Sequence, residues 1–213
     1  MRHSVDCSNI SDDGVDCASP LCVLSGCDAA VYGVTILNSE LFVVRWKHAD
    51  RVEVYDAVDS FQCLRHLSIV HIQPAPGAGR LRSLLSYMRV TALRGSAESQ
   101  AETLPARITD IAACHISSTL YGSDLSNCRI LRLRADDAAV ITEWPVEGGA
   151  YGLSVTVCGH LIVCCTGAQE LRQYRADGRL LQRVSLPAEC LQPWHAIQLP
   201  STDRVAVCHG GRY

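Results

Sequence analysis

The sequence predicts an all-β fold made of repeated units of four short strands, and three observations support this. The tripeptide Arg134-Ala135-Asp136 returns as Arg175-Ala176-Asp177, and Pro145 returns as Pro187 at nearly the same interval. Short apolar runs keep that interval along most of the chain. An interval of roughly 40–45 residues with four strands in each unit is typical of β-propeller blades. We therefore predict a β-propeller.

Four strands can be placed in each predicted blade. Strict alternation is clearest in Arg51-Val52-Glu53-Val54-Tyr55, as expected of a half-buried strand. Pro145 and Pro187 are expected to end outer strands, since proline lacks a backbone donor. The innermost strands are expected at 32–36, 110–114, 152–157 and 195–199, and the second strands at 41–44, 120–122, 161–164 and 205–208. The third strands are expected at 51–55, 128–133 and 170–174, and the fourth strands at 63–70, 140–144 and 180–186.

The predicted ring is incomplete. The fourth blade stops after its second strand, so about three and a half blades are present, whereas closed propellers have roughly four to eight. We expect either a fragment of a longer propeller or a chain that assembles with other copies. Open blade edges favour self-association, because an unpaired strand edge is a template for further pairing.

Two segments interrupt the blade pattern. Residues 1–28 are polar and lack apolar periodicity, so they are expected to form a disordered tail ahead of the propeller at 29–213. Residues 73–107 form an insertion with a linker-like composition and a helix-like centre. That centre, Arg80–Arg94, is basic and amphipathic, so it either docks on a membrane, an RNA or an acidic partner, or is a solvated loop.

Composition limits the classes of partner and compartment. The net charge of −3 gives no argument for nucleic-acid binding. The chain as given shows neither a signal peptide nor a long apolar span, and its 12 cysteines are expected to be reduced, so we predict a cytoplasmic protein. Cysteines within apolar runs are expected in the core, namely Cys158, Cys164, Cys165 and Cys208.

The second blade resembles an NHL repeat. Three runs carry the resemblance in the order and spacing of that family: Asp110-Ile111-Ala112-Ala113, then Leu120-Tyr121-Gly122-Ser123-Asp124, then Asn127-Cys128-Arg129-Ile130. The first and third blades match more weakly, and Cys128 stands where the family has a histidine. The chain is therefore similar to the wider NHL-like, TolB-like group of six-bladed propellers, over about residues 31–72 and 108–213.

The resemblance implies a fold and a range of functions. It implies that Asp124 organises the turn beside Asn127. Members of the family mostly present a propeller face to protein partners, and some bind RNA. Related six-bladed propellers include metal-dependent lactonases and lyases. We predict a non-catalytic scaffold that binds another protein, with a metal-dependent hydrolase or lyase as the alternative.

One propeller face collects the candidate binding residues. Loops after the second strands and approaches to the innermost strands should emerge on the same side. Aromatic residues with basic neighbours can anchor a protein partner, although Tyr151 and Trp194 could instead pack between blades. The predicted binding residues are Trp46, Lys47, His48, Tyr151, Trp194 and His195.

An enzyme site is poorly supported. A metal in the central channel needs three or four ligands from different blades. The innermost strands offer Asp110 and His195, while Tyr32 and Gly152 occupy the other comparable positions. No nucleophile or phosphate-loop motif occurs either. We therefore predict no catalytic residues, no metal and no cofactor.

Overall fold

The fold is described from a computed structural model. The structure describes residues 30–45, 48–58, 62–71, 106–199, 202 and 204–210. The predicted tail at 1–28, nearly all of the predicted insertion at 73–107, and the residues Trp46 and Lys47 lie outside these ranges. In the described part, β-strands dominate, and a 3-10 turn spans Thr166–Ala168. No helix there is long and apolar enough to cross a membrane.

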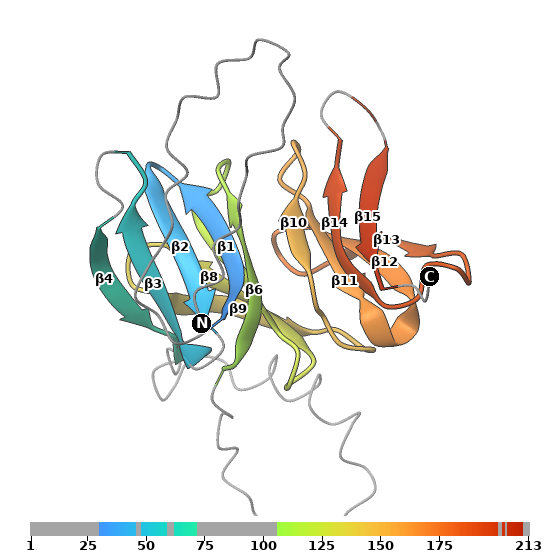
Figure 1. Ribbon diagram of the computed structural model, residues 1–213, viewed down its shortest axis with the longest axis horizontal. Helices are drawn as coiled ribbons and strands as arrows, with labels where there is room; N and C mark the ends of the chain where they lie inside the picture. Colours follow the sequence, from blue (N-terminus) through green and yellow to red (C-terminus); the bar gives the residue numbers. More distant parts are fainter. Residues whose placement is uncertain are drawn as a thin grey trace, which may run out of the picture.

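Four sheets follow one another along the chain, and within each of them the consecutive strands of one blade pair antiparallel (Figure 1). Blade 1 contains β1 (Val31–Leu37), β2 (Glu40–Arg45), β3 (Arg51–Asp56) and β4 (Cys63–Ser68). Blade 2 contains β6 (Ile108–Cys114), β7 (Thr119–Asp124), β8 (Arg129–Arg134) and β9 (Ala139–Pro145). Blade 3 contains β10 (Leu153–Val155), β11 (Leu161–Cys165), β12 (Glu170–Tyr174) and β13 (Leu180–Ser185). The described part of blade 4 contains β14 (Pro193–Gln198) and β15 (Val205–His209).

The blades are arranged as a fan with their first strands at the centre. In Figure 1 the strands β1, β6, β10 and β14 lie side by side in the middle, while β4 lies at the left margin. Backbone and side-chain hydrogen bonds join neighbouring blades. The Thr35 hydroxyl accepts from the Ala113 amide, and the Ser154 hydroxyl donates to the Ala196 carbonyl. The strand order agrees with the predicted propeller blades.

The core lies between the blades because the second strands, β2, β7 and β11, are buried on both faces. Phe42 and Val52 of blade 1 pack with Leu131 of blade 2. On its other side, blade 2 contributes Tyr121 to a second cluster that it shares with blade 3. The cluster between blades 3 and 4 is smaller. Burial on two faces explains why β7 is buried at every position.

The chain between the first two blades differs from its prediction. We expected one outer strand over residues 63–70, but β4 ends at Ser68, and the separate strand β5 (Val70–His71) pairs in parallel with β9. The Ile69 amide, between the two strands, donates to the Asp50 carbonyl. This bond extends the pairing of β3 with β4 by one residue before the chain reaches β9 of blade 2.

Cysteine burial was predicted correctly for only part of the set. Cys164 and Cys165 are fully buried, and burial raises the pKa of their thiols to about 12 and about 11. Cys158 and Cys208 are exposed, so their prediction as core residues was wrong. Cys158 lies in a turn between two strands, and Cys208 lies on a strand whose blade has only two described strands.

Candidate functional site

Each innermost strand begins with a β-bulge, and the four bulges lie on one face. In blade 1 the pairing register shifts at Tyr32, in blade 2 at Thr109 and in blade 4 at Trp194. In blade 3, the Tyr151 amide donates to the Cys164 carbonyl, and the Gly152 carbonyl accepts from the Cys164 amide. Two residues of this strand therefore lie opposite one residue of β11, which defines a bulge. Bulges re-aim side chains and occur next to functional sites. Here they bring three aromatic residues to equivalent positions.

The residue after each bulge lies toward the neighbouring blade. These residues are Gly33, Asp110, Gly152 and His195, so glycine alternates with a polar side chain from blade to blade. The prediction that Tyr32 is equivalent to Asp110 was wrong by one residue, because alternation along a strand does not reveal a bulge. Gly33 is the equivalent residue.

The glycines allow close approach of the next blade. A Cβ atom on Gly33 would lie 2.7 Å from Asp110 Oδ1, and one on Gly152 would lie 2.0 Å from the Trp194 carbonyl oxygen. A side chain at either position would push two blades apart. The alternation therefore joins blade 1 closely to blade 2, and blade 3 closely to blade 4.

Asp110 connects three blades at the centre. Its Oδ1 accepts from the Ile111 amide, and its Oδ2 accepts from the Leu153 amide of blade 3 at 2.8 Å. Asp110 Oδ2 also lies 3.3 Å from His195 Nδ1 of blade 4. Asp110 and His195, the two candidate metal ligands of the sequence analysis, are thus in direct contact. Gly152, which lies against His195, has no side chain to separate them.

The pair makes stability depend on pH. The hydrogen bond to Asp110 raises the pKa of His195. A raised folded-state pKa contributes stability that is fully present below the unfolded value of about 6.5 and is lost as pH rises through the folded value. Because the imidazole is half-exposed, we expect a small effect, of about 0.2–1 kcal/mol.

We expect the melting temperature of the native chain to exceed that of His195→Gln most at pH 5.5–6.5, and the difference to shrink by pH 8.5. Thermal melts across this range measure it. The control His115→Gln changes an exposed histidine in the turn that follows β6, at the end of that strand remote from Asp110. A difference that stays constant with pH for His195→Gln would contradict the pairing.

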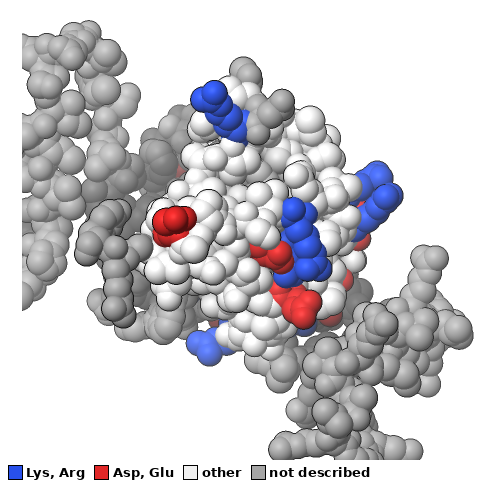
Figure 2. Space-filling view, turned by 90° about the vertical axis from the view of Figure 1, so that its right-hand side faces the viewer, with Lys and Arg blue, Asp and Glu red and all other residues white. Residues whose placement is uncertain are grey.

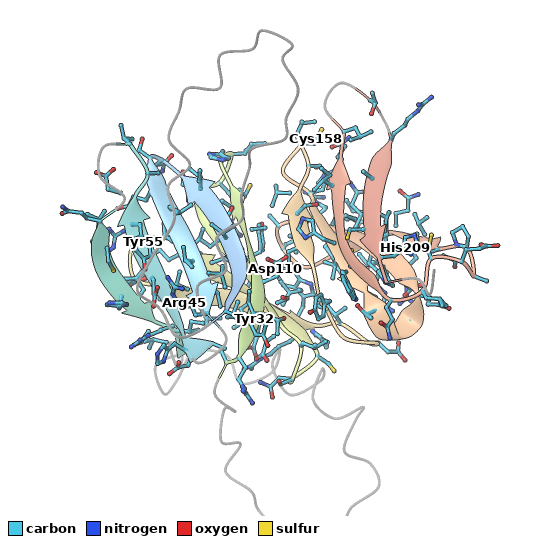
Figure 3. All side chains as sticks on the ribbon, in the orientation of Figure 1. Tyr32, Arg45, Tyr55, Asp110, Cys158 and His209 are labelled. Atoms are coloured by element: carbon cyan, nitrogen blue, oxygen red, sulfur yellow. The ribbon has the colours of Figure 1, made fainter. Side chains whose placement is uncertain are left out.

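The aromatic bulge residues and His195 form a surface that we call the mouth surface, defined as Tyr32, Tyr151, Trp194 and His195. Trp194 is 47 % exposed and Tyr151 is 37 % exposed. Burial raises the pKa of Tyr32, and the nearby Tyr151 hydroxyl contributes to the same direction. Figure 3 shows Tyr32 and Asp110 near each other at the fan centre, with Cys158 at the opposite end.

Most predicted binding residues can be placed. Tyr151, Trp194 and His195 lie together on the mouth surface, and sequence reasoning missed Tyr32 as a member. The signal that could have found it was the recurrence of an aromatic residue directly before Gly33, Gly152 and His195. His48 lies in the turn between β2 and β3 and is partly buried. The predicted binding residues Trp46 and Lys47 lie outside the described residues.

Asp124 lies at the end of β7 and holds the following turn. Its carboxylate accepts from the backbone amide of Asn127 at 3.2 Å and from the Asn127 side chain at 2.7 Å. Arg129 donates to the same carboxylate at 2.9 Å. The strand pairings give Arg45 and Cys165 as the equivalents of Asp124 in blades 1 and 3. At this position, among the described residues of blades 1 to 3, blade 2 alone has a carboxylate.

Arg45 carries its own network in blade 1. Its Nε donates to Glu53 Oε2 at 2.7 Å, and the Tyr55 hydroxyl donates to the same oxygen at 2.8 Å. All three side chains are buried. Hydrogen bonds from Arg45 and Tyr55 outweigh the effect of burial and lower the pKa of Glu53. The pairing satisfies a charge that would otherwise be costly to bury.

Few side chains in the described ranges are placed to take part in catalysis. Within the described ranges, no three histidine, cysteine, aspartate or glutamate side chains are grouped as metal ligands. Asp110 and His195 could supply two ligands, or a polarised imidazole. The Asp110 carboxylate is already engaged by two backbone amides.

The comparisons with known proteins agree on the fold. No protein-family model and no curated protein sequence matches the chain. A catalytically inactive virginiamycin B lyase from Staphylococcus aureus, solved with quinupristin, is similar with a TM-score of 0.52 and 14% identity, over 81% of this chain and 47% of that one. The WD40 β-propeller domain of Doa1 is similar with a TM-score of 0.55 and 12% identity, over 86% of this chain and 49% of that one.

BamB from Moraxella catarrhalis is similar with a TM-score of 0.50 and 7% identity, over 82% of this chain and 38% of that one. The chain thus spans half or less of each of these propellers. At such identities the similarity shows the fold alone, because one fold hosts many functions. The chain is a β-propeller in its described part, as the blade repeat predicted.

Proposed function

We propose that this chain is a non-catalytic scaffold that binds a protein partner through the mouth surface. The observation that carries the proposal is the repeated bulge, which brings Tyr32, Tyr151 and Trp194 from three blades to one face. Tyrosine and tryptophan are enriched among the residues that dominate binding energy at interfaces. We also assign the blades to the NHL-like, TolB-like group, supported by the Asp124–Asn127 turn.

The rigidity of the mouth surface supports this role. The Thr166 hydroxyl donates to the carbonyl of Pro193, next to Trp194, and the Ser123 hydroxyl donates to the Tyr151 carbonyl. These hydrogen bonds cross from one blade to the next. An anchor whose backbone is already fixed loses less conformational entropy on binding.

The test is partner capture by matched variants of the purified chain. We expect Trp194→Ala and Tyr151→Ala to each weaken capture at least tenfold, because truncation of an aromatic anchor costs about 2 kcal/mol or more. The control Ile116→Ala removes an exposed apolar side chain in the β6–β7 turn, away from the bulges. Melting curves check that each variant folds. Equal capture by all variants would remove the proposal.

A second candidate is a metal-dependent hydrolase or lyase, and the Asp110–His195 contact is the observation that favours it. Melting with saturating calcium or zinc distinguishes the candidates. A resident site would raise the melting temperature, since a ligand at about 100 times its dissociation constant stabilises by about 2.7 kcal/mol. We expect no shift if the chain is a scaffold, whereas a shift abolished by Asp110→Asn would favour the enzyme.

A further inference from the structure

The Asp110 carboxylate of blade 2 lies at the centre of the fan, and each of the other described blades has a residue that meets it. A Cβ atom on Gly33 of blade 1 would lie 2.7 Å from Asp110 Oδ1. From blade 3, the Leu153 amide donates to Oδ2 at 2.8 Å, and from blade 4, His195 Nδ1 lies 3.3 Å from the same oxygen. One carboxylate is therefore the common contact of these blades.

An aromatic residue of the mouth surface accompanies each of these contacts. Tyr32 directly precedes the blade 1 contact, Tyr151 lies two residues before the blade 3 contact, and Trp194 directly precedes the blade 4 contact. The backbones of blades 3 and 4 touch at this point, since a Cβ on Gly152 would lie 2.0 Å from the Trp194 carbonyl oxygen. The mouth surface thus combines aromatic side chains from three blades with a single acidic group.

This combination of groups suits an organic cation. The face of an aromatic ring is negative, so it attracts an ammonium or guanidinium group, and tryptophan does so most strongly. A carboxylate adds Coulomb attraction, which is stronger where water is partly excluded. The Asp110 side chain is 14 % exposed. Its two backbone amide partners argue against a metal ion, but they do not oppose an organic cation, which needs no coordination bond.

Neighbouring charges modify the field at the mouth surface. A neutral His195 imidazole donates its Nδ1 hydrogen to Asp110 and leaves the negative charge in place, whereas the protonated ring balances that charge. Burial raises the pKa of Tyr32, and the nearby Arg107 guanidinium opposes that rise, so one positive charge lies beside the surface. The side of the molecule formed by β14 and β15 offers a cation little competing attraction, because uncharged residues cover most of it (Figure 2).

We propose that the mouth surface recognises a cationic side chain of the protein partner, which contacts the Tyr151 and Trp194 rings and is attracted by the Asp110 carboxylate. The side chain is a lysine, a methylated lysine or an arginine. This inference rests on the proposed function, because it names the chemistry that the same surface recognises. Aromatic anchors alone would accept an apolar side chain equally well, so the carboxylate is the group that selects a cation.

Choline is the probe, because it carries a quaternary ammonium group and has an uncharged isostere in which carbon replaces the nitrogen. Ligand-observed NMR titrations of the full chain at pH 8.5, well above the ordinary histidine pKa of about 6.5, measure both affinities. We expect choline to bind at least tenfold more tightly than the isostere. Both ligands offer the rings the same apolar surface, so the ratio reports the effect of charge. Equal affinities would overturn the proposal.

Variants separate the contributions of the rings and the carboxylate. Trp194→Ala is expected to weaken choline and the isostere alike, whereas Asp110→Asn should weaken choline about fivefold or more and spare the isostere. Arg107→Gln removes the opposing charge and should strengthen choline binding by about twofold. The control Ile116→Ala should change neither affinity. Native choline affinity in a folded Asp110→Asn would overturn the proposal, and the isostere comparison decides it even if that variant does not fold.

Partner capture and choline binding test different statements about the mouth surface. If Trp194→Ala weakens capture but choline and its isostere bind equally, the cation assignment is overturned and the proposed function stands. If choline is preferred and Trp194→Ala leaves capture unchanged, the cation site stands and the proposed role in protein binding is overturned.

Discussion

Tyr121→Ala is expected to lower the free energy of unfolding by about 3–5 kcal/mol, the cost typical of truncating a buried aromatic residue. Tyr121 is fully buried on β7, and its ring meets the Trp144 ring edge to face at a centroid distance of 6.2 Å. Its loss leaves a cavity in the cluster that joins blades 2 and 3. Urea or thermal denaturation would measure the change, and we expect a drop of roughly 10 °C in melting temperature.

Tyr121→Phe is the matched control, because it keeps the ring and removes only the hydroxyl. In the described structure that hydroxyl is buried and has no hydrogen-bond partner. The hydroxyls of Ser117 and Thr119 lie near it but bond to each other at 2.8 Å. An unsatisfied buried polar group costs about 1–3 kcal/mol, so Tyr121→Phe should be at least as stable as the native chain. A loss of stability in Tyr121→Phe like that of Tyr121→Ala would show that the ring is not the main contribution.

Gly152→Ala is expected to separate blade 4 from blade 3. The added Cβ would lie 2.0 Å from the Trp194 carbonyl oxygen and 2.8 Å from the His195 Cα. Backbone atoms cannot rotate away, so β14 has to move by about 1 Å or more, and overpacking of this kind costs about 1–3 kcal/mol. Hydrogen exchange by mass spectrometry should show lost protection over 193–209, while blade 2 keeps its protection.

The control for this substitution is Gly210→Ala. Its added Cβ would lie 3.2 Å from the edge of the Trp194 ring, a side chain that can shift slightly. We expect protection of β14 and β15 to stay near native. Undisturbed exchange in Gly152→Ala would mean that the two blades are not in close contact at this point.

Much of the fold could be predicted because it is repeated. Each blade has the same sequence of apolar runs and polar turns, so an error in one blade is corrected by its neighbours. The third strand of blade 3 was predicted as Glu170–Tyr174 and has those bounds. The strand β5 could not be predicted, because a two-residue strand has no period and its partner β9 is distant in sequence.

The candidate site was predicted only in part, and the bulges explain why. A bulge adds one residue to a strand without changing its composition, so Tyr32 was assigned to the position that Gly33 occupies. The contact between Asp110 and His195 depends on the absence of a side chain at Gly152, and a sequence pattern does not show which glycine faces another blade. The exposure of Cys208 was also not predicted, because the burial of a strand residue depends on which strands lie beside it, and the apolar run around Cys208 does not show this.

The alternation of glycine with Asp110 and His195 at the centre has a consequence for protein engineering. A second copy of blade 2, inserted directly after the first, would place two copies of the Asp110 carboxylate side by side. A second copy of blade 3 would place two copies of Gly152 side by side, with no side chain to fill the space between the two blades. Inserting two adjacent blades together keeps every central glycine next to a blade with a polar side chain at the equivalent position. The exchangeable module of this propeller is thus a pair of blades, and chimeras should be cut at every second inter-blade junction.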